Sequence, residues 1–237
     1  MKNFKTIVTT LLLFLIVTSC TFAQKREIIE KTYPIQSFTS VESDIVGNVI
    51  YTQSNKVSVR VEGDKELVDR LLVSEQNGVL EIDLDGKINN IGKKKIAVYI
   101  SSPTIEGVDS EGVGNFIMEG LVAANNLTID FEGVGNFEAM NLECTNIKAN
   151  YEGVGNLKLG GTTNYLEVSS EGVGNVNTQN LKAKNAVIRA EGVGSVKCFA
   201  SESIDLKNSG VGSITYYGNP TVKNLSNSGI GKIRDGN

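Results

Sequence analysis

Five glutamates recur along the chain at intervals of 19 to 21 residues, each directly before a glycine. They are Glu111, Glu132, Glu152, Glu171 and Glu191. Hard divalent cations such as calcium prefer carboxylate oxygens, so a stacked column of these side chains would be a cation-binding surface. The competing interpretation is a row of solvated acids before a tight bend. Dedicated calcium-binding β-helices repeat a nonapeptide with aspartate in the glycine-rich turn. This chain has neither feature, so no metal site is assigned, and calcium is kept only as a candidate cofactor.

Four asparagines follow the same glutamates at a constant offset. They are Asn115, Asn136, Asn156 and Asn175. Amide side chains stacked at strand spacing hydrogen-bond one another and satisfy backbone groups at a corner of the chain. The sequence therefore predicts a structural column of turn residues here rather than a ligand site.

The composition removes several classes of enzyme. The chain contains no histidine and no tryptophan, and its formal net charge is −4. Without histidine it has no Ser-His or Cys-His nucleophile pair and no imidazole acid or base, and the negative charge argues against a nucleic-acid partner. One carboxylate pair still has a spacing that suits acid–base chemistry. Asp109 and Asp130 each precede a repeated glycine by three residues, which would make them neighbours if the repeats stack.

The elements that position these side chains follow from a repeated motif, Glu-Gly-Val-Gly-Asn, which starts at Glu111. Seven full or degenerate copies occur, and their first glycines lie 18 to 21 residues apart. Apolar and polar residues alternate before and after each copy, as in Leu127–Phe131, and this period of two is typical of strands with one buried face. Each unit is therefore a strand, a Gly-x-Gly bend and a second strand.

Short strands at a fixed period with no helix between them stack as a parallel β-helix. We predict an all-β, right-handed parallel β-helix (solenoid) of about seven coils over residues 106–237, with the hand taken from the crossover preference of parallel strands. Two residue columns are expected to form its core. The first is Val113, Val134, Val154, Val173, Val193, Val211 and Ile230; the second is Phe116, Phe137, Leu157, Val176, Val196, Ile214 and Ile233.

Residues 24–105 lack the regular repeat but are rich in strand patterns, so they are predicted to form an N-terminal β-rich section that caps the solenoid. A short helix is expected over residues 64–72 and a hairpin turn at Asn77-Gly78. Ile45–Asn48 has the form of an early, degenerate motif copy.

The first residues have the pattern of an export signal. Lys2 and Lys5 precede an apolar run of signal-peptide length over residues 11–17. Two processing sites compete. Cleavage after Ala23 gives a leader of residues 1–23, whereas Val17–Cys20 resembles a lipobox, which gives a leader of residues 1–19 and a lipid anchor on Cys20.

Several strings along the chain resemble one known family. They include residues 38–43, 57–64, 79–82 and 98–103, followed by the Glu-Gly-Val-Gly-Asn copies. In this ensemble the chain resembles the putative auto-transporter adhesin, head GIN domain family of exported bacterial proteins. The resemblance implies a β-helical fold and a cell-envelope location, and it carries over no catalytic residue.

These observations together predict an exported envelope or surface protein that is not an enzyme and has an adhesive or structural binding role. The alternative is a carbohydrate-active β-helix that acts on or binds envelope or extracellular polysaccharide. The location is the periplasm, the outer membrane through a lipid anchor, or the extracellular space. The partner classes left open are a glycan, a surface protein and a second copy of the chain.

Overall fold

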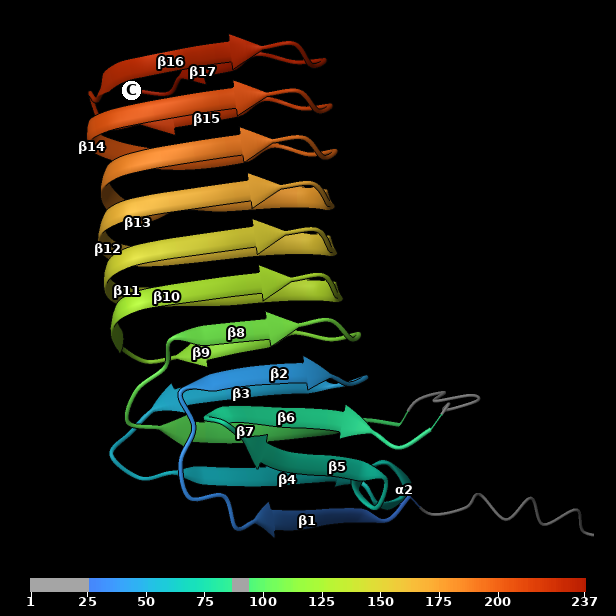
Figure 1. The fold of residues 1–237 in the computed structure, drawn as a ribbon. Coiled ribbons are helices and arrows are strands. Elements are labelled where there is room, and N and C mark those ends of the chain that lie inside the picture. Colours follow the sequence, from blue (N-terminus) through green and yellow to red (C-terminus); the bar gives the residue numbers. More distant parts are fainter. Residues whose placement is uncertain (1–25, 87–93) are drawn as a thin grey trace, which may run out of the picture.

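The computed structural model describes residues 26–86 and 94–237, and within them it confirms the predicted solenoid. One 17-stranded sheet winds into a column of stacked coils (Figure 1). The described residues contain one short helix, α2 (Lys65–Val68). It is shorter than predicted, because the chain re-enters a strand at Leu71.

The middle of the column consists of long strands that bend around the corners of the solenoid and pair in parallel with the coil before and after. These strands are β10 (Val122–Phe131), β11 (Val134–Tyr151), β12 (Val154–Ser170), β13 (Val173–Ala190) and β14 (Val196–Asn208). The C-terminal coils are β15 (Ile214–Tyr217), β16 (Thr221–Asn227) and β17 (Ile233–Asp235). Motif copies therefore stack directly on one another.

The N-terminal section supplies further layers of the same column. Its parallel strands are β2 (Ser40–Asp44), β3 (Asn48–Gln53), β6 (Val79–Leu84), β7 (Ile96–Ser102), β8 (Gly107–Ser110) and β9 (Phe116–Glu119). The β2–β3 coil lies between the β6–β7 layer and the β8–β9 coil, so the chain returns to stack above an earlier coil. The early motif copy at Ile45–Asn48 pairs with the first full copy through Val46 and Val113, as the sequence suggested.

Antiparallel strands close the N-terminal end of the column. They are β1 (Ile28–Tyr33), β4 (Ser58–Asp64) and β5 (Leu71–Gln76). The predicted hairpin turn joins β5 to β6, and both of its residues have positive φ, 54° at Asn77 and 83° at Gly78. These strands cover what would otherwise be a bare sheet edge.

The second predicted core column is buried through the regular coils. Phe116, Phe137 and Leu157 are at most 1% exposed. Val176, Val196 and Ile214 continue the column toward the C-terminal end, and they are also buried. The Phe116 and Phe137 rings stack with centroids 5.2 Å apart, and Phe131 stacks on Tyr151 at 5.9 Å. Parallel coils place like residues over one another, so aromatic residues at matching positions of adjacent coils stack in pairs.

The two cysteines of the described chain lie inside the solenoid. Cys144 and Cys198 are both buried and form no disulfide, as is usual for small core residues. Burial raises the pKa of the Cys198 thiol to about 12. The thiol is therefore protonated at neutral pH and unreactive.

The first predicted core column is wrong. Val113, Val134, Val154, Val173, Val193 and Val211 are between 47% and 53% exposed, and Ile230 is 74% exposed. The period-two alternation of the preceding strand runs on through the motif. Phe131 points inward, Glu132 outward, Gly133 inward and Val134 outward. The strand phase, and not the apolar character of valine, decides the direction of this side chain.

The two glycines of each motif allow the corner backbones of adjacent coils to touch. The second glycines have φ between 141° and 151°, a region that side chains rarely adopt. A Cβ placed on Gly155 would overlap the carbonyl oxygen of Gly135 in the coil below, and Gly153 has the same relation to Gly133. The unusual φ of the second glycine and the close backbone approach at both glycines explain why glycine occupies these positions.

We expect Gly155→Ala to destabilise the protein by more than about 4 kcal/mol or to prevent folding, because it combines an unfavourable φ with a backbone clash. Gly120→Ala is the matched control. Gly120 also has positive φ, 75°, but a Cβ there meets no atom within 4 Å, so we expect a cost of about 1 kcal/mol. Urea denaturation of both variants measures the difference, and equal costs would show that the corners are not closely packed.

A second pair of variants separates the two columns. Leu157 is fully buried and Val154 is 50% exposed. We expect Leu157→Ala to cost about 2–5 kcal/mol through lost burial and a cavity, and Val154→Ser to cost less than about 1 kcal/mol. Thermal unfolding followed by circular dichroism gives both values, and a larger loss for Val154→Ser would mean that its side chain is buried.

Candidate functional site

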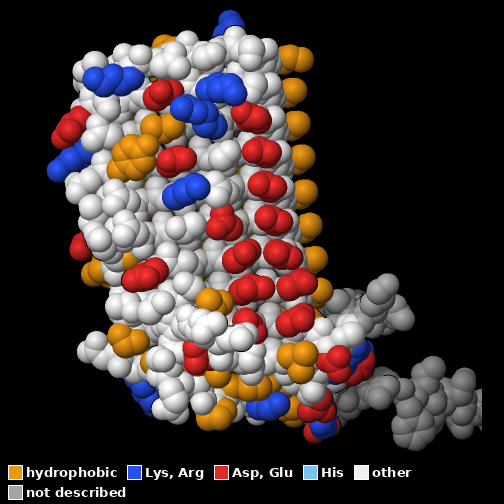
Figure 2. Space-filling model, in the orientation of Figure 1, with side chains coloured by type: hydrophobic (Ala, Val, Ile, Leu, Met, Phe, Trp, Pro, Cys, Tyr) orange, Lys and Arg blue, Asp and Glu red, His pale blue; other side chains and the backbone are white. Residues whose placement is uncertain are grey.

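The outward valines form a ridge along one corner of the solenoid. We call it the valine ridge: Val113, Val134, Val154, Val173, Val193, Val211 and Ile230. Each member forms a parallel bridge or strand pair with the next, so the rungs lie ~4.8 Å apart. Figure 2 shows a straight column of hydrophobic side chains that projects from the edge of the molecule. A contiguous exposed apolar surface of this kind marks an interaction site in many proteins.

The five predicted glutamates stand in a column beside the ridge. All five are exposed, and the parallel register places each above the one before it. The register continues the column downward through Asp44 and Asp83. We call Asp83, Asp44, Glu111, Glu132, Glu152, Glu171 and Glu191 the glutamate column, and Figure 2 shows this line of acidic side chains next to the ridge.

A second acidic row runs parallel to the glutamate column over the N-terminal coils. Strand pairing aligns Glu42 with Glu81 and with Asp109, and Asp109 with Asp130. The same row continues toward the C-terminal end as Asn150, Ser169, Arg189 and Lys207. The face is therefore acidic toward the N-terminal end and carries basic residues near its C-terminal end (Figure 2).

Asp109 occupies the most crowded position of this acidic surface. Its Oδ1 atom is buried and has no hydrogen-bond partner. Partial burial, and then the negative charges of Glu111, Asp130, Glu42 and Glu132, raise the pKa of Asp109 from 3.8 to about 6. The fold thus holds a carboxyl group whose charged form is disfavoured at this place.

The asparagine column forms a hydrogen-bonded ladder at the next corner position. The Nδ2 atom of Asn136 donates to Oδ1 of Asn115 over 2.9 Å, and Asn156 donates to Asn136 in the same way. Asn175 continues the ladder upward, and Asn48 accepts from Asn115 below. These amides bond one another and nearby backbone N–H groups, so the contacts seen here are structural.

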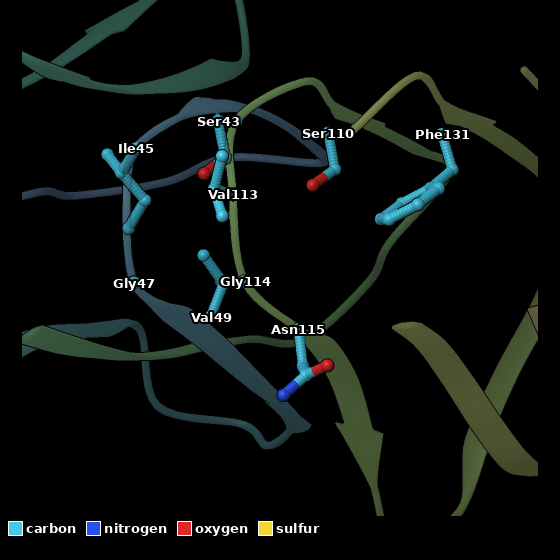
Figure 3. Close-up of a pocket in the computed structure, with 10 residues that line it drawn as sticks. Ser43, Ile45, Gly47, Val49, Ser110, Val113, Gly114, Asn115 and Phe131 are labelled. Atoms are coloured by element: carbon cyan, nitrogen blue, oxygen red, sulfur yellow. The ribbon is translucent and has the colours of Figure 1, made fainter. Parts of the chain in front are cut away.

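Among the described residues, the cavities found are smaller than a typical substrate pocket, and no cluster of metal-ligating side chains is found. A cavity of about 10 Å³ lies between the early motif copy and the first full copy, lined by Ile45, Val49 and Phe131 among others (Figure 3). It has room for a single water molecule. Two shallow surface hollows measure about 210 and 200 Å³, below the usual size of ligand pockets. No group of three or more His, Cys, Asp or Glu in the described chain is placed to hold a metal ion.

The model of the family "putative auto-transporter adhesin, head GIN domain" matches residues 37–220. The chain belongs to this family. The match spans most of the N-terminal section and most of the regular coils.

Solved structures agree with the family assignment. A putative adhesin from Bacteroides fragilis is 36% identical, with a TM-score of 0.84, over 88% of this chain and 97% of that one. Two further solved structures share the fold. A putative adhesin from Parabacteroides merdae is 20% identical, with a TM-score of 0.65, over 88% of this chain and 96% of that one. A putative lipid binding protein from Parabacteroides distasonis is 18% identical, with a TM-score of 0.69, over 88% of this chain and 97% of that one. No match was found among curated proteins. The family and its structural neighbours support an adhesin-like, surface or exported protein.

Two predictions concern parts of the chain that the structure leaves out. The leader and Cys20 lie outside the described residues, so cleavage and lipidation remain predictions. Among the residues that are described, no helix is both long and apolar enough to cross a membrane.

The valine ridge is the most distinctive surface of the molecule, and it was not predicted from the sequence. The signal that identifies it was present in the sequence. Counting in steps of two from a buried residue, such as Phe131, places the motif valine on the outer face. An apolar residue at a regular outward position then predicts a contact surface rather than core.

The raised pKa of Asp109 predicts a dependence of stability on pH. The folded protein binds this proton more tightly than the unfolded chain, so the contribution of Asp109 to the free energy of unfolding is highest below the unfolded pKa. It falls as pH rises from about 4 toward the folded pKa of about 6. We expect Asp109→Asn to raise the melting temperature above wild type at neutral pH, by about 2–4 °C for a gain of about 1 kcal/mol, since solvent screens part of the effect.

Melting curves at pH 4 and pH 7.5 test this expectation. Near pH 4 the wild-type carboxyl group is protonated, so wild type and variant should converge. Glu143→Gln removes one exposed carboxylate elsewhere and serves as the control. A difference between wild type and Asp109→Asn that is the same at both pH values would contradict the assignment.

Proposed function

We propose that this protein is exported and acts in the cell envelope or at the cell surface as a binding protein that uses the valine ridge and the adjoining side of the solenoid for adhesion. The observation that carries the proposal is the unbroken row of seven outward apolar side chains. The family and its solved relative from Bacteroides fragilis, both described as putative adhesins, support the same role.

The ridge has the properties of a contact surface rather than of a structural element. Its valines lie on the outer face of the glycine corner, and about half of each side chain meets solvent. An exposed serine or threonine would fit the same position without exposing apolar surface to water. Repetition over seven rungs suits an extended partner, because each coil adds the same small contact.

Catalysis on a polysaccharide is the competing function. It would use Asp109 and Asp130, which are paired neighbours on adjacent coils. The pKa of Asp109 is raised. Against it, one oxygen of Asp109 is buried, and the hollow beside the pair is only about 200 Å³ and shallow. Release of reducing ends from an acidic polysaccharide by wild type, lost in Asp109→Asn, would establish catalysis in place of adhesion.

The test of the proposed function is a binding array of glycans and extracellular matrix proteins probed with the monomeric chain of residues 24–237. We expect ligands whose signal falls at least about fivefold in the variant Val134→Ser/Val154→Ser/Val173→Ser, since three central rungs lose their apolar contact. The control variant replaces three exposed apolar residues elsewhere, Leu72→Ser/Leu121→Ser/Met140→Ser. Equal loss in both variants, or no loss in the ridge variant, would contradict a binding role for the ridge.

A further inference from the structure

We propose that the occupant of the valine ridge is an extended, cationic polypeptide segment in which basic and apolar side chains alternate. The inference rests on the proposed function, because it names the partner of the same face. It is carried by the position of the ridge directly beside the glutamate column, which combines an apolar contact line with a line of negative charge.

The charge beside the ridge is large and mostly uncompensated in the described part of the chain. The glutamate column has seven carboxylates in register, and the second acidic row adds Glu81, Glu42, Asp109 and Asp130. In the described residues one ion pair to this surface is found, from Lys207 to Glu191 over 3.1 Å. Aligned carboxylates along a low-dielectric wall produce a strong negative potential that attracts and orients a cation-rich partner.

The same charges argue against the other occupants of the ridge. A second copy docked ridge to ridge would bring two glutamate columns to the same narrow interface, and like charges there oppose association. A calcium ion alone takes six to eight oxygen ligands, and in the described chain no group of three or more His, Cys, Asp or Glu is placed to hold a metal ion. A glycan of neutral or acidic sugars has no positive charge to match the column.

The dimensions fit a short peptide. From Val113 to Ile230 the ridge has six steps of ~4.8 Å, or ~29 Å in all, which an extended segment of about nine residues covers. In an extended segment alternate side chains point to opposite sides. One set of side chains then reaches the glutamate column while the other lies on the valines. The aliphatic stems of lysine also cover apolar surface while the ammonium group stays near a carboxylate.

The experiment uses three fluorescent peptides of about twelve residues, slightly longer than the ridge. The first peptide alternates Lys with Val, the second alternates Lys with Ser, and the third alternates Glu with Val. Fluorescence anisotropy with the monomeric chain of residues 24–237 is measured at about 50 mM and about 300 mM NaCl, because screening separates charge from apolar contact. We expect the Lys-Val peptide to bind most tightly and to lose at least about tenfold in affinity at the higher salt. The Glu-Val peptide should not bind.

Two variants assign the binding to the proposed face. Glu132→Gln/Glu152→Gln/Glu171→Gln removes three central charges, and we expect it to weaken the Lys-Val peptide at least about tenfold. Glu106→Gln/Glu143→Gln/Glu202→Gln removes the same charge from exposed glutamates outside the column, and we expect less than about a twofold change.

A third variant tests the apolar half of the contact. Val134→Thr/Val154→Thr/Val173→Thr keeps β-branched side chains and therefore strand preference. It should abolish the preference for Lys-Val over Lys-Ser. Melting curves of each variant show that the chain remains folded.

Three outcomes would overturn the inference. The first is equal weakening of the Lys-Val peptide by the two glutamate variants. The second is self-association in sedimentation that the threonine variant removes, which would make a second copy the occupant. The third is an array ligand that depends on the ridge while the Lys-Val peptide fails to bind, which would leave the proposed function intact and change only the partner. Loss of ridge dependence in the array as well would remove the proposed function itself.

Discussion

The close approach of backbone at the glycine corners is the constraint on which the rest of this structure depends. Each motif glycine lies against the backbone of the coil below with no room for a Cβ, and the second glycine of each motif has a φ that other residues avoid. Backbone in direct contact lets adjacent coils keep strand spacing around the corner as well as along the flat faces. The pairing therefore runs without interruption from one coil to the next through the motif.

This constraint also determines the surface. Because both glycines occupy the inner side of the corner, the residue between them has to point outward, and in every copy that residue is valine or isoleucine. The preceding outward position is acidic in five of the seven copies. One local motif thus generates the valine ridge and most of the glutamate column together, at the spacing of the coils. A solenoid converts repetition in sequence into a line of like side chains on the surface.

Stacking like residues has opposite consequences for different chemistries. Stacked amides stabilise one another, because an asparagine in the ladder donates a hydrogen bond to one neighbour and accepts a hydrogen bond from the other. Carboxylates do not, since aligned negative charges repel. At Asp109, partial burial and then the charges of neighbouring carboxylates from both acidic rows raise the pKa of the carboxyl group to about 6. A protein that keeps such charges in line beside an apolar ridge is suited to a partner that neutralises them.

The sequence by itself determined the architecture. The repeated Gly-x-Gly at intervals of 18 to 21 residues and the alternation on either side of it were sufficient to predict parallel coils. The buried column of Phe137 and Leu157 followed from the same pattern, since short-range alternation is a local property.

Tertiary structure decided which residues from distant parts of the chain line up on the side of the column. The direction of the motif valines was readable from the sequence, because a strand side chain points according to its phase relative to the buried residues, although their apolar character had placed them in the core. The return of the chain over the β2–β3 coil was decided by the tertiary structure, and it brings Asp44 and Glu42 into line with Glu111 and Asp109. No local pattern encodes that alignment, since it joins residues 67 positions apart through long-range pairing.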